Sequence, residues 1–282
     1  MPELPELEVI REVIHRRLVG RKLVEAQLLR PLVVRAPAPL DLQDPFVDQT
    51  LEGVERRGKF LFLHWPAPEK IVINPMLVGR FHLTHPGSQR LASTIVVWRF
   101  EGDLELRYTD PQAMGKIYLV RSLTDVPGLA SLGPEPLAIG PEAFGERLHR
   151  RRGEIKGILV NQKFLAGIGN AYADEILWRA RIYPFLRRPQ LSDEEEARLH
   201  EAIRTELEEA TARVREEMGE DISLKPRQSL SVHGKGGDPC PRCGTKITEI
   251  RGRNRLTNFC RVCQPGIMAG RTRRLAKAEQ ES

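Results

Sequence analysis

The chain has 282 residues, 40% of them hydrophobic and 29% charged, a globular composition with room for two domains and a small appended module. It contains no run of the roughly 18 apolar residues that a membrane span needs, and its acidic start does not resemble a secretory signal peptide. The formal net charge is +6. We therefore expect a soluble, cytoplasmic protein.

The positive charge is concentrated at the C-terminal end. Residues 225–282 carry a balance of +9, so the preceding 224 residues sum to −3. A concentrated basic segment indicates a polyanionic partner, most often nucleic acid. The last stretch, RTRRLAKAEQES, can equally be a solvated basic tail.

The chain opens with MPELPELEVI. Methionine before a small residue is usually removed, which would leave Pro2 with a free secondary amine; taken alone, most chains with proline second do no chemistry with it. Pro5 suits the first turn of a helix. That helix is predicted to end near Gly20, because apolar residues recur at helical spacing at Leu7, Ile10, Ile14 and Leu18.

Short β-rich runs follow the predicted helix. They read VERRGKFLFLHW, KIVIN, STIVVWRF, DLELRYT and KIYLV, and turn residues separate them. Several strands at this spacing indicate a β-sandwich or a barrel. Residues 125–145 are rich in proline and glycine, which predicts a linker between domains.

The second half of the chain is predicted to be helical. Ser192 and Glu195 have the spacing of a capping box at a helix start. The helix is expected to stop near Glu220 and to bury the stripe Leu199, Ile203, Leu207, Ala210, Val214 and Met218. We predict a β domain at residues 1–130, a helical domain at 131–224 and a metal-binding module at 225–282.

The four cysteines form two CxxC pairs, Cys240 with Cys243 and Cys260 with Cys263, separated by 16 residues. This is the spacing of a four-cysteine zinc ribbon. Two disulfides are the alternative, which a cytosolic chain disfavours. Because four thiolates complete a tetrahedral shell, the spacing predicts one structural zinc ion.

Three motifs together resemble the formamidopyrimidine-DNA glycosylase and endonuclease VIII family, and the former more closely. They are MPELPE, FLAGIGNAYADEIL and the terminal four-cysteine ribbon, which cover the full length in the same order. The resemblance implies an α+β multidomain fold with an N-terminal β-sandwich and helix, a helical helix–two-turns–helix domain and a zinc ribbon. It also implies a bifunctional base-excision repair enzyme, a DNA glycosylase with AP lyase activity. Damaged double-stranded DNA is the implied partner; we expect a monomer in the cytoplasm, associated with the nucleoid.

The resemblance implies three catalytic residues. Pro2 is the nucleophile, and its chemistry is plausible because an α-amine has a pKa of about 7.7–8, against about 10.4 for lysine. Glu3 is the general acid at the sugar ring oxygen, although a carboxylate there also suits a helix start. Lys59 matches a lysine on an early strand that contacts phosphate; without the resemblance it would be an exposed strand lysine. Glu6 is expected to be structural.

The resemblance also implies DNA-binding residues. Met76 and Met114 are the apolar side chains that fill the stack after the damaged base is flipped out. Asn170 and Arg255 contact the DNA backbone, and Lys156 lies near the active site. Without the family context, Asn170 would be a turn former and Arg255 a surface charge.

The sequence departs from the family pattern around the lesion-reading elements. Asn74 and Pro75 precede Met76, and the stretch Gln112–Ala113–Met114 lacks the family's probing arginine. Asn161 replaces an aspartate, and the segment 219–239 is short. These changes keep two alternatives open: an endonuclease VIII-like enzyme for oxidised pyrimidines, and a damaged-DNA-binding protein without catalysis.

Overall fold

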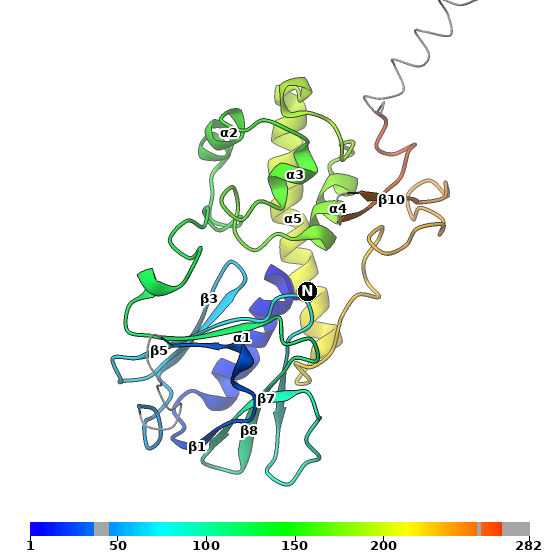
Figure 1. Cartoon of the computed structure of the whole chain (residues 1–282). Coiled ribbons are helices and arrows are strands. Elements are labelled where there is room, and N and C mark those ends of the chain that lie inside the picture. Colours follow the sequence, from blue (N-terminus) through cyan, green and yellow to red (C-terminus); the bar gives the residue numbers. More distant parts are fainter. Residues whose placement is uncertain (37–44, 253–254, 267–282) are drawn as a thin grey trace, which may run out of the picture. The chain divides into compact units, whose positions relative to one another are not determined.

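The computed structural model describes residues 1–36, 45–252 and 255–266 (Figure 1). The basic tail RTRRLAKAEQES lies outside the described residues. The chain divides into two compact units, which we call unit 1 (Met1–Glu135 with Glu208–Arg227) and unit 2 (Pro136–Leu207 with Gln228–Ser282). The domain boundaries at residues 130 and 224 stay a prediction. None of the helices in the described ranges is both long and apolar enough to cross a membrane.

Unit 1 begins with helix α1 (Leu4–Leu18), as predicted. Pro5 lies in its first turn, where a missing N–H costs no hydrogen bond. The Glu6 carboxylate accepts a hydrogen bond of 2.9 Å from the Glu3 N–H, which is part of a capping box. The predicted apolar face is fully packed, since Leu7, Ile10, Ile14 and Leu18 are all buried.

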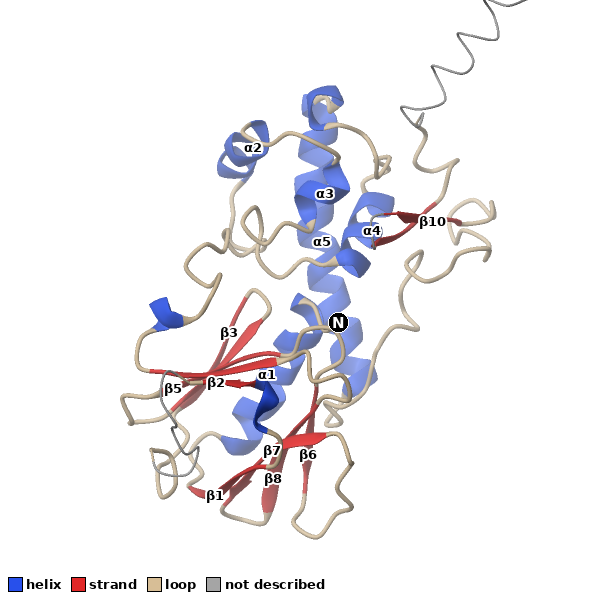
Figure 2. Cartoon of the chain, in the orientation of Figure 1, coloured by secondary structure: helices blue, strands red, loops and turns tan. Residues whose placement is uncertain are grey.

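Two β-sheets accompany α1, which confirms the predicted N-terminal β-sandwich with a helix (Figure 2). The four-stranded sheet has the order β1 (Leu23–Leu28), β7 (Thr94–Phe100), β8 (Leu104–Thr109) and β6 (Arg80–Thr84). The five-stranded sheet has the order β2 (Val34–Arg35), β9 (Lys116–Val120), β5 (Lys70–Asn74), β4 (Phe60–His64) and β3 (Gly53–Arg57). The sequence runs did not include β1, β2 and β6, which are short or interrupted by charged residues.

Both sheets and α1 contribute to one hydrophobic core, represented by Ile14, Leu63, Ile73, Trp98 and Leu106. Three connections cross from one sheet to the other: residues 29–33 join β1 to β2, residues 75–79 join β5 to β6, and residues 110–115 join β8 to β9. The last two are called the crossing loops below. At one end of these loops Asn74 pairs with Lys116, and at the other Arg80 pairs with Thr109. The strand register therefore holds the two crossing loops side by side.

Unit 2 is helical, and its longest helix, α5, continues into unit 1. The helices are α2 (Pro141–His149), α3 (Ile155–Leu159), α4 (Asn170–Arg179) and α5 (Asp193–Met218). Short 3₁₀ turns occur at Pro31–Val33, Leu123–Asp125 and Arg188–Gln190. The capping box at α5 is confirmed, with hydrogen bonds of 3.0 and 3.2 Å between Ser192 and Glu195. The predicted apolar stripe of α5 is buried throughout.

The linker predicted at residues 125–145 ends earlier than expected. Its last five residues form the first turn of α2, with Pro141 at the position where proline is tolerated. Phe144 is fully buried and packs on Phe164 and His200. A proline that begins a helix was therefore wrongly interpreted as part of a loop.

The last described element is a hairpin of β10 (Thr248–Gly252) and β11 (Arg255–Phe259). It lies between the two CxxC pairs in the sequence, as in a zinc ribbon. The predicted fold class, a mixed α+β chain with β-sheets, a helical region and a four-cysteine cluster, is confirmed.

Candidate functional site

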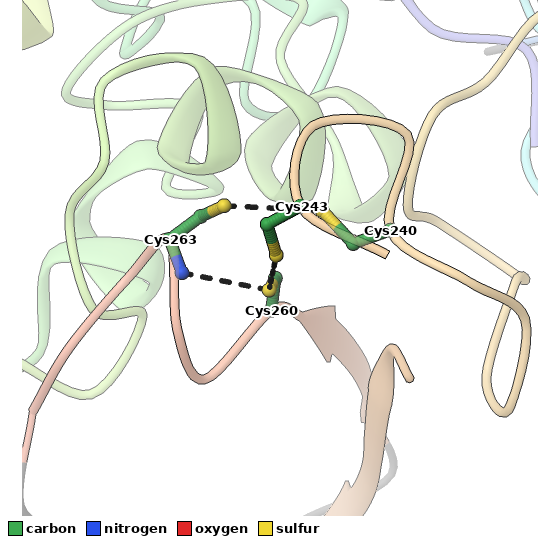
Figure 3. Close-up of side chains that lie close together, drawn as sticks. All are labelled: Cys240, Cys243, Cys260 and Cys263. Carbon is green, nitrogen blue, oxygen red and sulfur yellow. Dashed lines mark hydrogen bonds between the residues drawn. The ribbon is translucent and has the colours of Figure 1, made fainter. Parts of the chain in front are cut away.

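The four cysteines form a metal centre. Their sulfur atoms all lie within 4.8 Å of one another, although they come from two separate segments (Figure 3). A tetrahedral zinc ion with Zn–S bonds of about 2.3 Å places its sulfurs about 3.8 Å apart. The contacts Cys243–Cys260 (3.4 Å) and Cys240–Cys263 (3.9 Å) fit this spacing and exceed a disulfide bond of about 2.05 Å. The cluster therefore suits one zinc ion with four protein ligands and no open position.

Backbone turns and α4 hold this cluster in place. The Gly244 N–H donates to the Cys240 carbonyl at 2.8 Å, and the Gln264 N–H donates to the Cys260 carbonyl at 2.9 Å. The indole Nε1 of Trp178, in α4, donates to the Cys240 sulfur at 3.4 Å. The metal centre is therefore part of the packing of unit 2.

Several buried polar side chains lie near the N-terminus of unit 1. Pro2 is buried, and Glu3, Glu6 and Lys59 are only 2%, 6% and 8% exposed. Glu3 precedes α1, whereas Lys59 belongs to the turn between β3 and β4. Pro2 and Glu6 line one hollow, and the charges of Glu3 and Glu6 act on Lys59, so the three predicted catalytic residues lie in one region of unit 1.

Lys59 differs from the sequence expectation in two respects. It lies in a β-turn and not on a strand, and it is buried and not exposed. Gly58 adopts φ +56°, a conformation that favours glycine, and its N–H donates to Glu135 Oε1 at 2.7 Å. Glu135 also forms an ion pair of 2.7 Å with Arg57. A remote carboxylate therefore fixes the turn that carries Lys59.

Burial changes the titration of these groups. Burial, followed by the charge of Glu3, raises the pKa of Glu6. Burial lowers the pKa of Lys59, against the opposing effect of Glu3 and Glu6. The pKa of the Met1 amine is lowered to about 6, first by burial and then by Arg227. The Met1 amine is therefore mostly neutral at pH 7.

The two crossing loops of unit 1 present apolar side chains. Met114 is 40% exposed, and its role in DNA binding stays a prediction. Met76 is only half-buried and adopts φ +49°, while the next residue, Leu77, is 46% exposed. Leu77 was not named from the sequence, because the family methionine was matched to the only methionine nearby. Exposure makes Leu77 the better candidate for a side chain that enters DNA.

Tyr108 packs against both crossing loops. A Cβ added to Gly79 or Gly115 would lie 2.1 or 1.9 Å from the Tyr108 hydroxyl, so only glycine fits at either position. In the second loop, the buried Asp110 accepts hydrogen bonds from the Gln112 N–H at 3.0 Å and the Gly115 N–H at 2.6 Å. The backbone of this loop is therefore fixed despite its changed sequence.

In unit 2, the side chains of Asn170 and Lys156 bind the same backbone carbonyl of the β10–β11 hairpin. Both side chains donate to the Leu256 carbonyl at 2.6 Å. Lys156 also donates to Thr257 Oγ1 at 2.8 Å and forms an ion pair of 2.7 Å with Asp174. It is 3% exposed, which argues for a structural role instead of direct DNA contact. Arg255 begins β11, next to Leu256, but its side chain lies outside the described residues.

The turn before α4 explains the change at Asn161. Gly167 adopts φ +93°, and its N–H donates to Gln162 Oε1 at 2.9 Å. The Asn161 side chain accepts a hydrogen bond of 3.0 Å from the Lys163 N–H. An aspartate would make the same local bond, so asparagine preserves this turn.

A further group of side chains near the N-terminus was missed from the sequence. Arg227 donates to the Met1 carbonyl at 3.0 Å, and Arg80 and Arg227 line a hollow that also includes Pro2. Arg80 begins β6, and Arg227 follows the end of α5. Arg80 and Arg227 are far apart in the sequence, so no local sequence pattern could have linked them.

Comparison with known proteins agrees with this architecture. Three family models match: the formamidopyrimidine-DNA glycosylase N-terminal domain at residues 1–117, its H2TH domain at 132–220, and the zinc finger found in FPG and IleRS at 237–266. The formamidopyrimidine-DNA glycosylase of Symbiobacterium thermophilum is 36% identical over 276 residues, covering 94% of this chain and 90% of that protein. The enzyme of Moorella thermoacetica is 36% identical over 262 residues, covering 89% and 95%.

Solved structures agree as well. A Lactococcus lactis Fpg complex with Fapy-dG-containing DNA has a TM-score of 0.85 and 30% identity, covering 94% of this chain and all of that one. A complex of the same enzyme with abasic-site DNA has a TM-score of 0.84 and 29% identity over the same shares. The chain belongs to the formamidopyrimidine-DNA glycosylase family of base-excision repair enzymes, and its four-cysteine cluster is that family's zinc finger.

Proposed function

We propose that this glycosylase removes oxidised or ring-opened bases from duplex DNA and then cleaves the strand, with the Pro2 amine as nucleophile. The observation that carries this proposal is the burial of Pro2 beside Glu3, Glu6 and Lys59. The resemblance to complexes with abasic and Fapy-dG DNA supports the same substrate class.

The first step forms a covalent enzyme–sugar bond. After Met1 is removed, the lone pair of the Pro2 nitrogen attacks C1′ of the flipped nucleotide, and the bond from C1′ to the base breaks with its electron pair. The base leaves as an anion that takes up a proton. Opening of the sugar ring then breaks the C1′–O4′ bond, with Glu3 donating the proton to O4′, and leaves an iminium cation on Pro2.

The second step cleaves the strand. The iminium withdraws electrons, so that C2′ loses a proton and the 3′-phosphate leaves with the electrons of the C3′–O bond. A second elimination across the conjugated system releases the 5′-phosphate in the same manner. Water then hydrolyses the iminium and frees the Pro2 amine. Lys59 provides positive charge beside the reacting sugar and contacts a phosphate, which suits a cation held in a desolvated position.

Other residues bind and distort the duplex. Met114 and Leu77 fill the space that the flipped nucleotide leaves. Leu77 takes the role that the sequence assigned to Met76. Asn170 and Arg255 contact backbone phosphates, which positions DNA without reading its sequence. Lys156 assists indirectly by holding the hairpin through the Leu256 carbonyl and Thr257. The zinc ion, bound by four thiolates, keeps this hairpin folded.

We further propose that the enzyme acts as a monomer on DNA in the cytoplasm, at the nucleoid. Oxidised and ring-opened purines are the preferred lesions in this proposal. The absence of a guanidinium in Gln112–Met114 keeps the endonuclease VIII-like alternative, oxidised pyrimidines, as an arm of the lesion comparison.

Borohydride trapping on abasic-site DNA tests the proposal directly. Reduction of the imine should give a stable cross-link, and peptide sequencing should place the adduct at Pro2. A variant with one extra residue ahead of Pro2 should bind DNA but lose trapping by on the order of 10³-fold or more, because an amide nitrogen is not nucleophilic. Pro2→Gly should retain some trapping through its primary amine. An adduct at Lys59 or Lys156 would refute the mechanism, and DNA binding without any cross-link would favour a non-catalytic binding protein.

A further inference from the structure

A buried hydroxyl group lies between the two crossing loops of unit 1. It belongs to Tyr108 in β8, which is fully buried and whose ring packs on Phe81 with centroids 5.3 Å apart. The hydroxyl has no hydrogen-bond partner among the described residues. Burial, followed by the charge of Asp110, raises the pKa of Tyr108, so the hydroxyl keeps its proton and remains a donor. A buried donor without an acceptor lowers stability, and phenylalanine would fill the same space without this penalty.

Each crossing loop brings one acceptor close to this hydroxyl. A Cβ added to Gly79 would overlap the hydroxyl and lie 2.5 Å from the Pro75 carbonyl oxygen. A Cβ added to Gly115 would also overlap it and lie 3.0 Å from Asp110 Oδ2. Neither glycine leaves room for a methyl group, so a water molecule does not fit on these sides, and DNA does not reach a fully buried side chain. An acceptor for the hydroxyl therefore has to come from one of the two loops.

The second crossing loop, residues 110–115, is already fixed by hydrogen bonds. The buried Asp110 carboxylate accepts from the Gln112 N–H through Oδ1 and from the Gly115 N–H through Oδ2, at 3.0 and 2.6 Å. Both of its oxygens are thus used by the loop backbone. On the Gly115 side, the Tyr108 hydroxyl faces a segment that is held in one conformation.

The first crossing loop, residues 75–79, is strained. Met76 adopts φ +49°, a left-handed conformation that is unfavourable for a long side chain and that is often found in segments with a second conformation. The following residue, Leu77, is 46% exposed. The Pro75 carbonyl accepts from the Gly79 N–H at 3.0 Å, and a carbonyl oxygen has a second lone pair for another donor. The first loop is therefore the one that is able to move and to offer an acceptor.

We infer that Tyr108 is a positioning residue whose hydroxyl donates to the Pro75 carbonyl when Leu77 enters the DNA stack. This inference rests on the proposed function, in which the crossing loops fill the space of the flipped nucleotide. The hydroxyl is unpaired in the free enzyme and hydrogen-bonded in the inserted state. The new bond therefore stabilises the inserted state alone, which shifts the loop toward insertion only on DNA that has a gap to fill.

Tyr108→Phe tests the inference because it removes the hydroxyl and keeps the ring. Fluorescence anisotropy gives the affinities for an undamaged duplex and for the same duplex with a borohydride-reduced abasic site, which the enzyme does not cleave. The variant should bind the abasic duplex about 5- to 30-fold more weakly, the effect of losing one buried hydrogen bond, and the undamaged duplex within about twofold of wild type. Trapping on a single-stranded abasic oligonucleotide should also stay within about twofold, since a single strand has no gap to fill. The urea midpoint of the free protein should be equal or higher, because an unpaired buried donor is gone.

Tyr118→Phe is the matched control, since it removes the hydroxyl of another buried tyrosine of unit 1, whose strand pairs it with Arg35 and Val72. It should bind both duplexes like wild type.

Three results would overturn the inference. Unchanged affinity of Tyr108→Phe for the abasic duplex would show that the hydroxyl does not act on the first loop. Equal losses on both duplexes, or a lower urea midpoint of the free protein, would show that the hydroxyl only supports the fold. The proposed function is scored on the wild type: absence of a Pro2 cross-link on abasic DNA rejects that function, whereas normal cross-linking with unchanged Tyr108→Phe affinities rejects only the role of Tyr108.

Discussion

Each of the two units buries a lysine beside carboxylates, and the two lysines are bonded very differently. Lys156 in unit 2 is 3% exposed and its ammonium group contacts Asp174, the Leu256 carbonyl and Thr257 Oγ1 at 2.6–2.8 Å. Lys59 in unit 1 is 8% exposed, yet no hydrogen bond or ion pair reaches it from the described part of the chain. Glu3 and Glu6 affect it only through their charge.

This difference in bonding indicates a structural role for Lys156 and a functional role for Lys59. A buried charge that is fully hydrogen-bonded holds segments together, and removing one partner leaves the other uncompensated. A buried charge without direct partners is retained at a cost in stability, which is characteristic of functional sites. We therefore interpret Lys156 as a support for the hairpin and Lys59 as a group reserved for DNA.

The largest expected effect tests the structural role of the zinc cluster in unit 2. Cys243→Ser should release zinc and abolish DNA binding, because structural zinc contributes on the order of 10 kcal/mol to small metal-dependent folds. Metal analysis and gel-shift assays measure both effects. Arg255→Ala is the control: it should keep zinc and weaken all duplexes alike, with a salt slope smaller by about 1. Stoichiometric zinc and normal affinity in Cys243→Ser would contradict the assignment.

Lys156→Met tests the same unit without touching the metal ligands. We expect a loss of about 3 kcal/mol in the free energy of unfolding, because the fully buried Asp174 would lose the ammonium group at its Oδ1. Its Oδ2 would keep the contacts with His233 and the Asn258 N–H. Urea denaturation of the full chain measures the loss. A Lys156→Met variant that is as stable as wild type but fails to bind DNA would show that Lys156 acts on DNA and is not a structural support.

Glu3→Gln examines the chemistry assigned to unit 1. Excision of a damaged base should slow by about 10²–10⁴-fold, since a general acid is lost while the shape of the side chain is kept. Cleavage at a preformed abasic site should be less affected, because that sugar already equilibrates with its open aldehyde. Single-turnover rates on the two substrates give the ratio, and equal losses would argue against a role at the ring oxygen.

Lys59→Met should not lower the free energy of unfolding at pH 7, in contrast to the loss expected for Lys156→Met. Burial lowers the folded-state pKa of Lys59 below its ordinary 10.5, so the unfolded chain binds the proton more readily. Wild-type stability should then rise with pH between the lowered pKa and 10.5, whereas the variant should lack this rise. At pH 7 the variant should be at least as stable as wild type and poorly active. Unfolding curves from pH 7 to pH 10.5 show whether the slopes differ, and parallel slopes would refute this explanation.

The smallest effect distinguishes two neighbours in one crossing loop. Leu77→Ala should weaken binding to lesion-containing duplexes by about 3- to 10-fold, the expected cost of removing a wedge that buries a few methylene groups. Met76→Ala is the matched comparison and should have less effect on binding, since its side chain is half-buried within the loop. Fluorescence anisotropy gives both affinities. A larger loss in Met76→Ala would restore the original sequence assignment.

Local patterns in the sequence predicted much of the fold. The zinc site follows from two CxxC pairs, helix α1 from apolar spacing, and the start of α5 from Ser192 and Glu195. The strands with continuous apolar runs were predicted as well, whereas β1 and β6 were not, because charged residues interrupt their patterns. Each successful prediction depends on residues within a few positions of one another, where backbone geometry alone limits the outcome.

Long-range contacts decided the rest. The sequence named Lys59 as a candidate, but only the fold buries it, through a turn that Glu135 fixes from 76 residues further on. Only the fold brings Arg80 and Arg227 to the hollow beside Pro2, and only the loop geometry exposes Leu77 in preference to Met76. The physical reason is that burial and charge environment depend on packing between segments far apart in the chain, and local sequence patterns do not encode that packing.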